Sequence, residues 1–214
     1  MTLGLMTLGL DDIAGIAHEP QGTPRGVVLL THGAGGSRDT PLLVSYCDEW
    51  AGRGWLAVRY NLPYRRRRPK GPPSGSAAAD RAAVADAVAA ARELADGPVI
   101  AGGHSYGGRM TAMAVADDGI AVDVLTLSSY PLHPPGKPDS ARTEHLPRIG
   151  VPTVFVHGTA DPFGSIDELA AAAAVVGGRT EVVEITGARH DLGSKVLDVP
   201  RLAADAALRL LANG

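Results

Sequence analysis

Short apolar runs alternate with longer alanine-rich stretches along most of the chain. The apolar runs predict strands at Val27–Thr31, Trp55–Tyr60, Val99–Ala101, Val122–Leu127, Thr153–His157 and Glu181–Ile185. Apolar residues at helical spacing predict helices at Pro41–Gly52, Ala77–Asp96, Tyr106–Ala116, Ile166–Val176 and Val199–Ala212. Strands this apolar are typical of a parallel sheet that is covered on both faces. The alternation therefore predicts an α/β fold, a three-layer sandwich with a mostly parallel sheet.

The stretch Ala77–Asp96 is interpreted as a helix that covers one face of this sheet. Ser76 is its candidate N-cap, and Gly97 with Pro98 ends it. Four apolar side chains share one helical face: Val84, Val88, Ala91 and Leu94. The longest irregular stretch, residues 128–150, is rich in proline and too short to build a large helical lid, which predicts a minimal cap or none.

Composition is that of an ordinary globular protein. The chain has 214 residues, of which 45% are hydrophobic and 20% charged. No linker divides it, so we expect one domain, residues 1–214. The net charge of −3 provides no basic field for nucleic acid or anionic membranes.

Three features of the sequence indicate the cellular compartment of the protein. No apolar run approaches the roughly 18 residues that a membrane span requires. The opening MTLGLMTLGL lacks the basic region and cleavage site of a secretory signal. The single cysteine, Cys47, lies in a predicted helix, where it is interpreted as a core thiol without an intramolecular disulfide partner. We therefore expect a cytoplasmic protein.

The segment PVIAGGHSYGGRM, residues 98–110, holds Ser105 between Gly103 and Gly107. It follows a predicted strand and opens a predicted helix. A serine on such a sharp turn has a strained backbone, and larger residues two positions away would collide with their surroundings. Ligands bind at this edge of open α/β sheets. The segment predicts Ser105 as a nucleophile and the Tyr106 amide, at a helix N-terminus, as half of an oxyanion hole.

A glycine loop, THGAGGSRDT, follows the first predicted parallel strand and can supply the other half. The backbone N–H of Ala34, with Gly35 as the alternative, is expected to reach the same oxygen. A tight strand-to-helix turn is compatible with this role.

A serine nucleophile needs a base and an acid that orients the base. The seven histidines are His18, His32, His104, His133, His145, His157 and His190. His190 lies in GARHDLG, after the last predicted strand, and Asp161 lies in HGTADPFG, after the strand Thr153–His157. They follow Ser105 in the chain order of this fold, which predicts Asp161 as the acid and His190 as the base. Asp123 and Asp191 remain alternatives for the acid.

The other histidines have less defined expectations. His104 and His157 are interpreted as packing or supporting residues, and His133 and His145 lie on the stretch that should overhang the site. The histidines are scattered, without H-x-x-x-H or C-x-x-C spacing, so no metal or cofactor is expected. The basic segment YRRRRPKGPP, residues 64–73, is either a solvated loop or a docking site for anionic substrates.

Six motifs occur in order: LLTHGAGG, GGHSYGGRM, YPLHPPGKP, TEHLP, HGTADPFG and ARHDL. With them, the chain from about Val27 onward resembles the small α/β-hydrolases grouped with testis-expressed protein 30 and the third regulatory subunit of the NSL histone acetyltransferase complex. It is also similar to dienelactone hydrolase relatives. The resemblance implies the α/β-hydrolase fold, with Ser105, Asp161 and His190 at the positions of the family triad. True dienelactone hydrolases have a cysteine in place of this serine.

Two functions follow from these residues. The first is a serine hydrolase that cleaves small carboxylic esters through an acyl-enzyme. The second is an interaction or scaffold protein that keeps the fold without turnover. The presence of nucleophile, base, acid and both oxyanion positions favours the enzyme, and thioester cleavage or transacylation would use the same site.

Overall fold

The computed structural model describes residues 10–73, 77–193 and 196–213. All but the last residue of the opening MTLGLMTLGL, and the candidate N-cap Ser76, lie outside the described residues. None of the described helices is long and apolar enough to cross a membrane.

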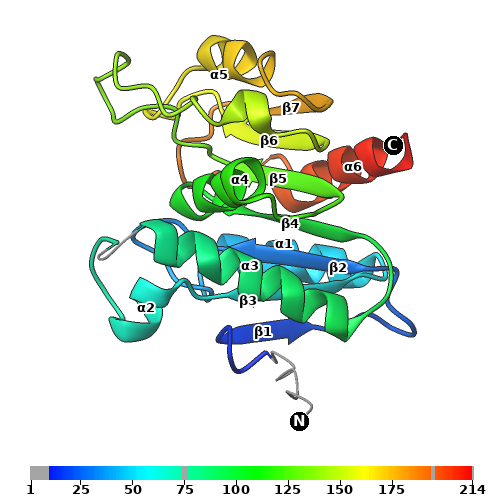
Figure 1. The fold of residues 1–214 in the computed structure, drawn as a ribbon. Helices are drawn as coiled ribbons and strands as arrows, with labels where there is room; N and C mark the ends of the chain where they lie inside the picture. The colour runs from blue at the N-terminus through cyan, green and yellow to red at the C-terminus, as the bar shows by residue number, and fades with distance from the viewer. Residues whose placement is uncertain (1–9, 74–76, 194–195, 214) are drawn as a thin grey trace.

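In the described part of the chain, seven strands form one sheet in the order β1-β3-β2-β4-β5-β6-β7 (Figure 1). The strands are β1 (Gly15–His18), β2 (Val27–Thr31), β3 (Leu56–Tyr60), β4 (Val99–His104), β5 (Val124–Ser128), β6 (Thr153–Gly158) and β7 (Thr180–Ile185). β1 pairs with β3 in the antiparallel sense, and all the other pairs are parallel. The mostly parallel sheet predicted from the apolar runs is confirmed.

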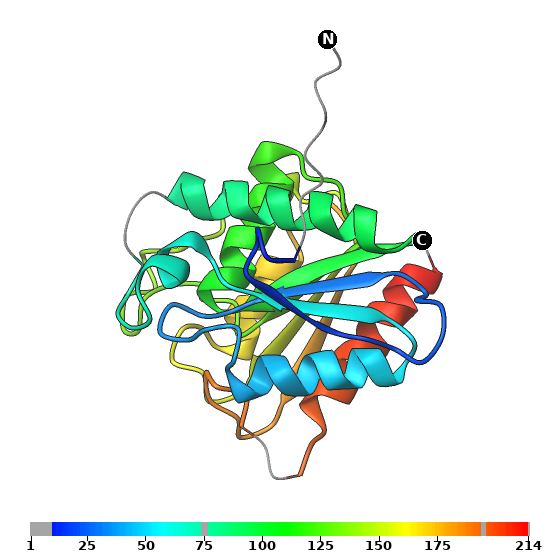
Figure 2. The ribbon, with the colours of Figure 1, turned by 90° about the horizontal axis from the view of Figure 1, so that it is seen from below.

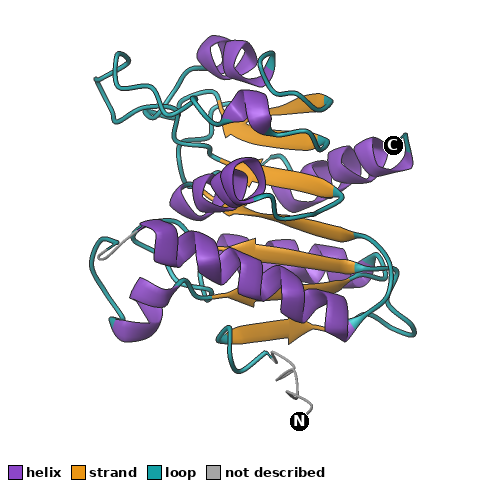
Figure 3. Cartoon of the chain, viewed as in Figure 1, coloured by secondary structure: helices purple, strands orange, loops and turns teal. Residues whose placement is uncertain are grey.

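Helices cover both faces of the sheet, as Figure 2 shows in a view from the β1 edge and Figure 3 shows by element type. The helices are α1 (Pro41–Gly52), α2 (Pro63–Arg67), α3 (Ala77–Leu94), α4 (Tyr106–Asp118), α5 (Ile166–Ala173), α6 (Val199–Ala212) and the 3₁₀ helix η1 (Leu146–Arg148). Side chains of α3, α4 and α5 join the core on one face, and those of α1 and α6 join the core on the other. The central strands are buried on both faces, which explains why their sequences are continuously apolar.

Several boundaries differ from the sequence predictions. β1 was not predicted because it is a four-residue, half-buried edge strand, and α2 was not predicted because it is a single basic turn. β4 continues through Gly102 and Gly103 to His104, α4 continues to Asp118, and α5 already ends at Ala173. In α3, Val84, Val88 and Ala91 are buried, whereas Leu94, the last residue of the helix, is 37% exposed.

The parallel strands bring four loops to one edge of the sheet, because the carboxyl ends of parallel strands point the same way. Ala34 follows β2, Ser105 follows β4, Asp161 follows β6 and His190 follows β7. Residues 129–145, between β5 and η1, are irregular and form no large helical cap.

Candidate active site

Ser105 occupies a strained turn between β4 and α4. Its φ is +51° and its ψ is −116°, and its amide donates to the Ser128 carbonyl oxygen at 2.8 Å. A Cβ on Gly103 would lie 2.4 Å from the Thr31 carbonyl oxygen, and one on Gly107 would lie 2.5 Å from that of His32. The two glycines therefore let the turn press against the end of β2, which is the physical reason for their spacing around the serine.

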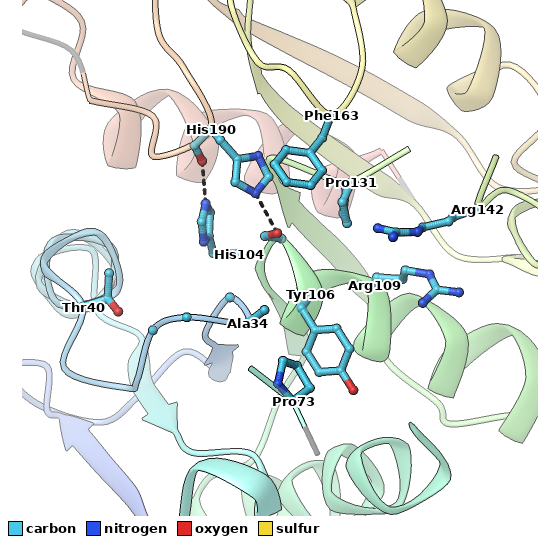
Figure 4. Close-up of a pocket in the computed structure, with 14 residues that line it drawn as sticks. Ala34, Thr40, Pro73, His104, Tyr106, Arg109, Pro131, Arg142, Phe163 and His190 are labelled. Atoms are coloured by element: carbon cyan, nitrogen blue, oxygen red, sulfur yellow. Dashed lines mark hydrogen bonds between the residues drawn. The ribbon is translucent and has the colours of Figure 1, made fainter. Parts of the chain in front are cut away.

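A continuous hydrogen-bonded chain joins Ser105, His190 and Asp161. His190 Nε2 lies 2.8 Å from Ser105 Oγ, and His190 Nδ1 lies 2.8 and 3.0 Å from the two carboxylate oxygens of Asp161. The first of these contacts is drawn as a dashed line in Figure 4. If Nδ1–H donates to the carboxylate, Nε2 is free to accept the serine proton.

The Asp161 carboxylate is inaccessible to solvent but stays ionised. Burial raises its pKa, but hydrogen bonds from the His190 side chain and the Phe163 amide outweigh this and bring the pKa below its usual value. The side chain of His157 also contributes, with Nε2 at 3.9 Å from the carboxylate. An ionised Asp161 can orient His190 and stabilise its protonated form.

The structure does not bring the alternative acids to His190 Nδ1. Asp123 accepts a hydrogen bond from the Val99 amide, at the opposite end of β4, and Asp191 accepts one from the Gly193 amide. Of the three candidates, Asp161 alone among the described contacts bonds to the imidazole.

His190 is held by two further contacts. His104 Nε2–H donates to the His190 carbonyl oxygen at 2.7 Å, which fixes the backbone of the loop. Burial lowers the pKa of His104 and keeps its ring neutral. The Phe163 ring lies 4.2 Å from the His190 ring between centroids. His104 thus has the supporting position expected from the sequence, whereas Phe163 was not anticipated.

In the glycine loop after β2, the Gly36 amide donates to the Gly33 carbonyl at 3.0 Å, which closes the turn. Among the hydrogen bonds of the described residues, none uses the amide of Ala34, Gly35 or Tyr106 as donor. The Ala34 carbonyl accepts from the Tyr64 hydroxyl and from the Arg65 guanidinium, both at 3.0 Å. These contacts hold the loop while leaving Ala34, Gly35 and Tyr106 amides available to a developing negative charge.

His32, at the start of the glycine loop, stabilises this loop through both of its ring nitrogens. The Leu62 amide donates to His32 Nε2 at 3.2 Å, so the ring proton lies on Nδ1 and donates to the Gly33 carbonyl at 2.9 Å. Burial lowers the pKa of His32 to about 4. The neutral ring therefore acts as a structural part of the turn.

A pocket of about 620 Å³ opens beside the serine (Figure 4). Its wall includes the glycine loop 33–36, Ser105 and His190, together with Phe163, Arg109 and Arg142. His133 and His145 are not part of this wall: His133 lies 3.4 Å from the Glu168 carboxylate, and His145 packs against Tyr130. The sequence analysis missed Arg109, although it lies four residues after Ser105 in the helix that the serine turn opens, and the sequence held no signal for Arg142.

The basic segment 64–73 is largely bound to its own surroundings. Arg65 donates to the carbonyls of Ala34, Arg68 and Gly71, Arg66 donates to that of Asp12, and Arg68 to that of Pro72. Of this segment, Pro73 lines the pocket. Among the described residues, no group of three acidic, histidine or cysteine side chains is arranged to hold a metal ion.

Comparison with known proteins places the chain in a family. The family described as the α/β-hydrolase domain matches residues 24–201, and the chain belongs to it. This confirms the α/β-hydrolase fold that the sequence motifs implied.

Solved structures share this fold at low sequence identity. Est1E from Butyrivibrio proteoclasticus, with bound ferulic acid, is 16% identical, with a TM-score of 0.77 over 97% of this chain and all of that one. A dienelactone hydrolase from Anabaena variabilis is 20% identical, with a TM-score of 0.70 over 93% and 90% of the two chains. Esterase 2 from Thermogutta terrifontis, phosphonylated by cyclosarin, is 21% identical, with a TM-score of 0.69 over 94% and 89%.

Proposed function

We propose that the protein is a serine hydrolase that cleaves small carboxylic esters through a Ser105–His190–Asp161 triad. The observation that carries this proposal is the hydrogen-bonded chain from Asp161 through His190 to Ser105, which ends at a pocket beside unpaired amides. The esterases among the structural neighbours support a hydrolase in general. The narrower grouping with testis-expressed protein 30 and the NSL subunit belongs to this proposal and rests on the sequence motifs.

The proposed reaction has two halves. Ser105 Oγ attacks the ester carbonyl carbon while His190 Nε2 takes its proton, and the oxygen that gains negative charge accepts hydrogen bonds from the amides of Ala34 and Tyr106. The tetrahedral intermediate collapses, and the alcohol leaves with the proton of His190. Water then attacks the acyl-enzyme, again with His190 as base, and releases the carboxylic acid and free Ser105.

The proposal includes the expectations drawn from composition: a cytoplasmic, single-domain protein that acts on a small molecule without a cofactor or nucleic acid. The same residues would support thioester cleavage or transacylation, because the acyl-enzyme is common to all three reactions. A scaffold protein without turnover would need neither a competent base nor free amides at the serine.

A fluorophosphonate probe separates the enzyme from the scaffold. Ser105 Oγ forms a bond to phosphorus and fluoride leaves, which requires the base and the oxyanion donors to be in place. We expect stoichiometric labelling of the wild-type protein at neutral pH, detected by intact mass. Labelling should disappear in Ser105→Ala and His190→Ala, and it should fall in acid, because an imidazolium cannot accept the serine proton.

Matched controls are available on the same fold. Ser45→Ala removes an exposed hydroxyl from α1, and His133→Ala removes a histidine outside the pocket wall, so both should still be labelled. A folded wild-type protein that stays unlabelled for hours, while a control hydrolase reacts, would overturn the proposed function in favour of the scaffold.

A further inference from the structure

Two arginines from separate elements lie at one end of the pocket. Arg109 comes from the first turn of α4, and Arg142 comes from the irregular stretch between β5 and η1. Figure 4 shows both at the end of the pocket that lies away from Thr40, with Arg142 beside Pro131. Both side chains are half-buried.

Neither arginine has an acidic partner. Among the described residues, no carboxylate oxygen lies within 4.0 Å of Arg109 or Arg142, and the buried Nε of Arg109 lacks a hydrogen-bond partner. Elsewhere in the protein, arginines contact carboxylates; these include Arg53, Arg59, Arg81, Arg148 and Arg209.

No carboxylate in the described part of the chain is among the groups that shift the pKa of Arg142. Burial and then the charge of Arg109 lower the pKa of Arg142. Burial and then the charge of Arg109 lower the pKa of His145 to about 4, against the opposing effect of Asp117 and Glu144, so its ring adds no positive charge at pH 7. Two half-buried cations without a carboxylate in contact are costly, and a bound anion would relieve that cost.

We propose that Arg109 and Arg142 form an anion-binding subsite, and that the preferred substrate is a short ester that also carries a carboxylate. A guanidinium presents a planar fork of N–H donors that matches the two oxygens of a carboxylate. The ester group would lie at Ser105 while its carboxylate is bound by the arginines at the other end of the pocket. This inference rests on the proposed function, since it assigns the substrate class of the same site.

The basic segment 64–73 is a weaker candidate for the same role. The guanidinium groups of Arg65, Arg66 and Arg68 donate to backbone carbonyls, and none of them lines the pocket. This makes Arg66 a suitable control, because its removal takes away one positive charge without altering the pocket wall.

The test compares matched esters that differ in charge and little else. One pair is 4-acetoxybenzoate and 4-acetoxybenzamide, with the carboxylate or amide on the leaving group. The other pair is the mono-p-nitrophenyl ester of adipic acid and the same ester with its free carboxylate replaced by a carboxamide, so that the charge differs at the far end of the acyl chain. We expect wild-type kcat/KM to favour the carboxylate in at least one pair by about 10- to 100-fold, the usual effect of charge-assisted hydrogen bonds.

In Arg109→Gln and in Arg142→Gln, the carboxylate-to-amide ratio of kcat/KM should fall towards one, whereas Arg66→Gln should keep the wild-type ratio. Arg142 is the safer variant if Arg109→Gln folds poorly, because it lies on an irregular segment. A binding experiment needs no turnover: adipate should bind to Ser105→Ala by calorimetry, and the added Arg142→Gln change should weaken its binding about 10-fold or more.

The outcomes separate this inference from the proposed function. Normal fluorophosphonate labelling with a wild-type ratio near one in both pairs would overturn the anion subsite alone. The anion subsite would also be overturned if Arg109→Gln and Arg142→Gln both keep the wild-type carboxylate-to-amide ratio of kcat/KM. The same holds if that ratio falls in Arg66→Gln instead. If the wild-type protein is not labelled, the proposed function fails, and the absence of Arg142-dependent adipate binding would then overturn the subsite as well.

Discussion

Asp161 illustrates how one side chain sets the state of another. Its carboxylate is buried, yet hydrogen bonds from His190 and the Phe163 amide keep its pKa low. An ionised acceptor at this place holds the imidazole proton on Nδ1, so that Nε2 faces the serine hydroxyl as an acceptor.

Asp161→Asn should therefore lower kcat by about 10³- to 10⁴-fold without unfolding the protein. The asparagine amide would donate to Nδ1 and favour the wrong imidazole tautomer, while its oxygen could still accept from the Phe163 amide. Steady-state kinetics on a p-nitrophenyl ester, together with a thermal unfolding curve, measure both effects.

Asp191→Asn is the matched control, because Asp191 is adjacent to His190 in the chain but accepts from the Gly193 amide. Its kcat should stay close to the wild-type value. Turnover of Asp161→Asn within about twofold of wild type would show that another group orients His190.

Ser105, Asp161 and His190 could be predicted from the sequence because each follows a strand, and because the chain order of the fold restricts which residues can fill the three roles. It did not reveal Arg109 and Arg142 as neighbours. Arg109 could have been placed on the face of α4 near Ser105, but the position of Arg142 depends on how an irregular, proline-rich segment folds back over the sheet edge. Neither the hydrophobic periodicity nor the spacing of motifs predicts the conformation of that segment.

At the scale of elements, the junction of β2, β4 and α4 determines where the serine lies. β2 and β4 pair in parallel, with Thr31 opposite Gly103, and α4 begins against the end of β2. The strand and helix periods predicted all three elements, and the strain of the serine turn explained small residues at Gly103 and Gly107, but the contact of both glycines with the end of β2 is seen only in the structure. The edge strand β1 was missed because four half-buried residues carry too short a pattern.

Gly107→Ala should disturb this junction. The added methyl group would lie 2.5 Å from the His32 carbonyl oxygen and 2.7 Å from Thr31 Cγ2, so α4 must shift away from β2. We expect Tm to fall by about 2–10 °C, because overpacking lowers the free energy of unfolding by about 1–3 kcal/mol, which shifts Tm by a few degrees per kcal/mol in a chain of this length. Fluorophosphonate labelling should slow at the same time, because the shift moves both Ser105 and the Tyr106 amide.

Gly52→Ala provides the contrast, since a Cβ at the last residue of α1 meets nothing within 4 Å. Alanine is the better helix former, so its Tm should equal or exceed that of the wild type. Gly107→Ala with wild-type Tm and labelling rate would contradict the close-approach account of the turn.

At the scale of the whole molecule, the layered arrangement brings the loops after β2, β4, β6 and β7 to one edge, and it buries several histidines in the process. Burial lowers the pKa of both His32 and His145 to about 4. In the unfolded chain, a histidine titrates near 6.5. Between these two values the unfolded state binds protons that the folded state does not bind.

The free energy of unfolding should therefore decrease as the pH is lowered from about 6.5 to about 4, by up to about 3 kcal/mol for each of these two histidines. Because the pKa of Asp161 is lowered, protonation of this residue at acid pH decreases the free energy of unfolding further. Burial raises the pKa of Asp80, so its protonation opposes this decrease. Urea unfolding at pH 7.5, 6.0, 5.0 and 4.5 measures the slope.

His145→Gln should make this slope shallower whatever it does to stability at pH 7.5, because it removes one of the proton-binding groups. Tyr130→Phe is the control: it removes the hydroxyl that lies 3.0 Å from His145 Nε2 but keeps the buried histidine, so the slope should persist. A stability that stays flat between pH 6.5 and 4.5 would show that these rings do not resist protonation in the folded protein. An identical slope in His145→Gln and wild type would assign the acid sensitivity to His32, His104 and the carboxylates instead.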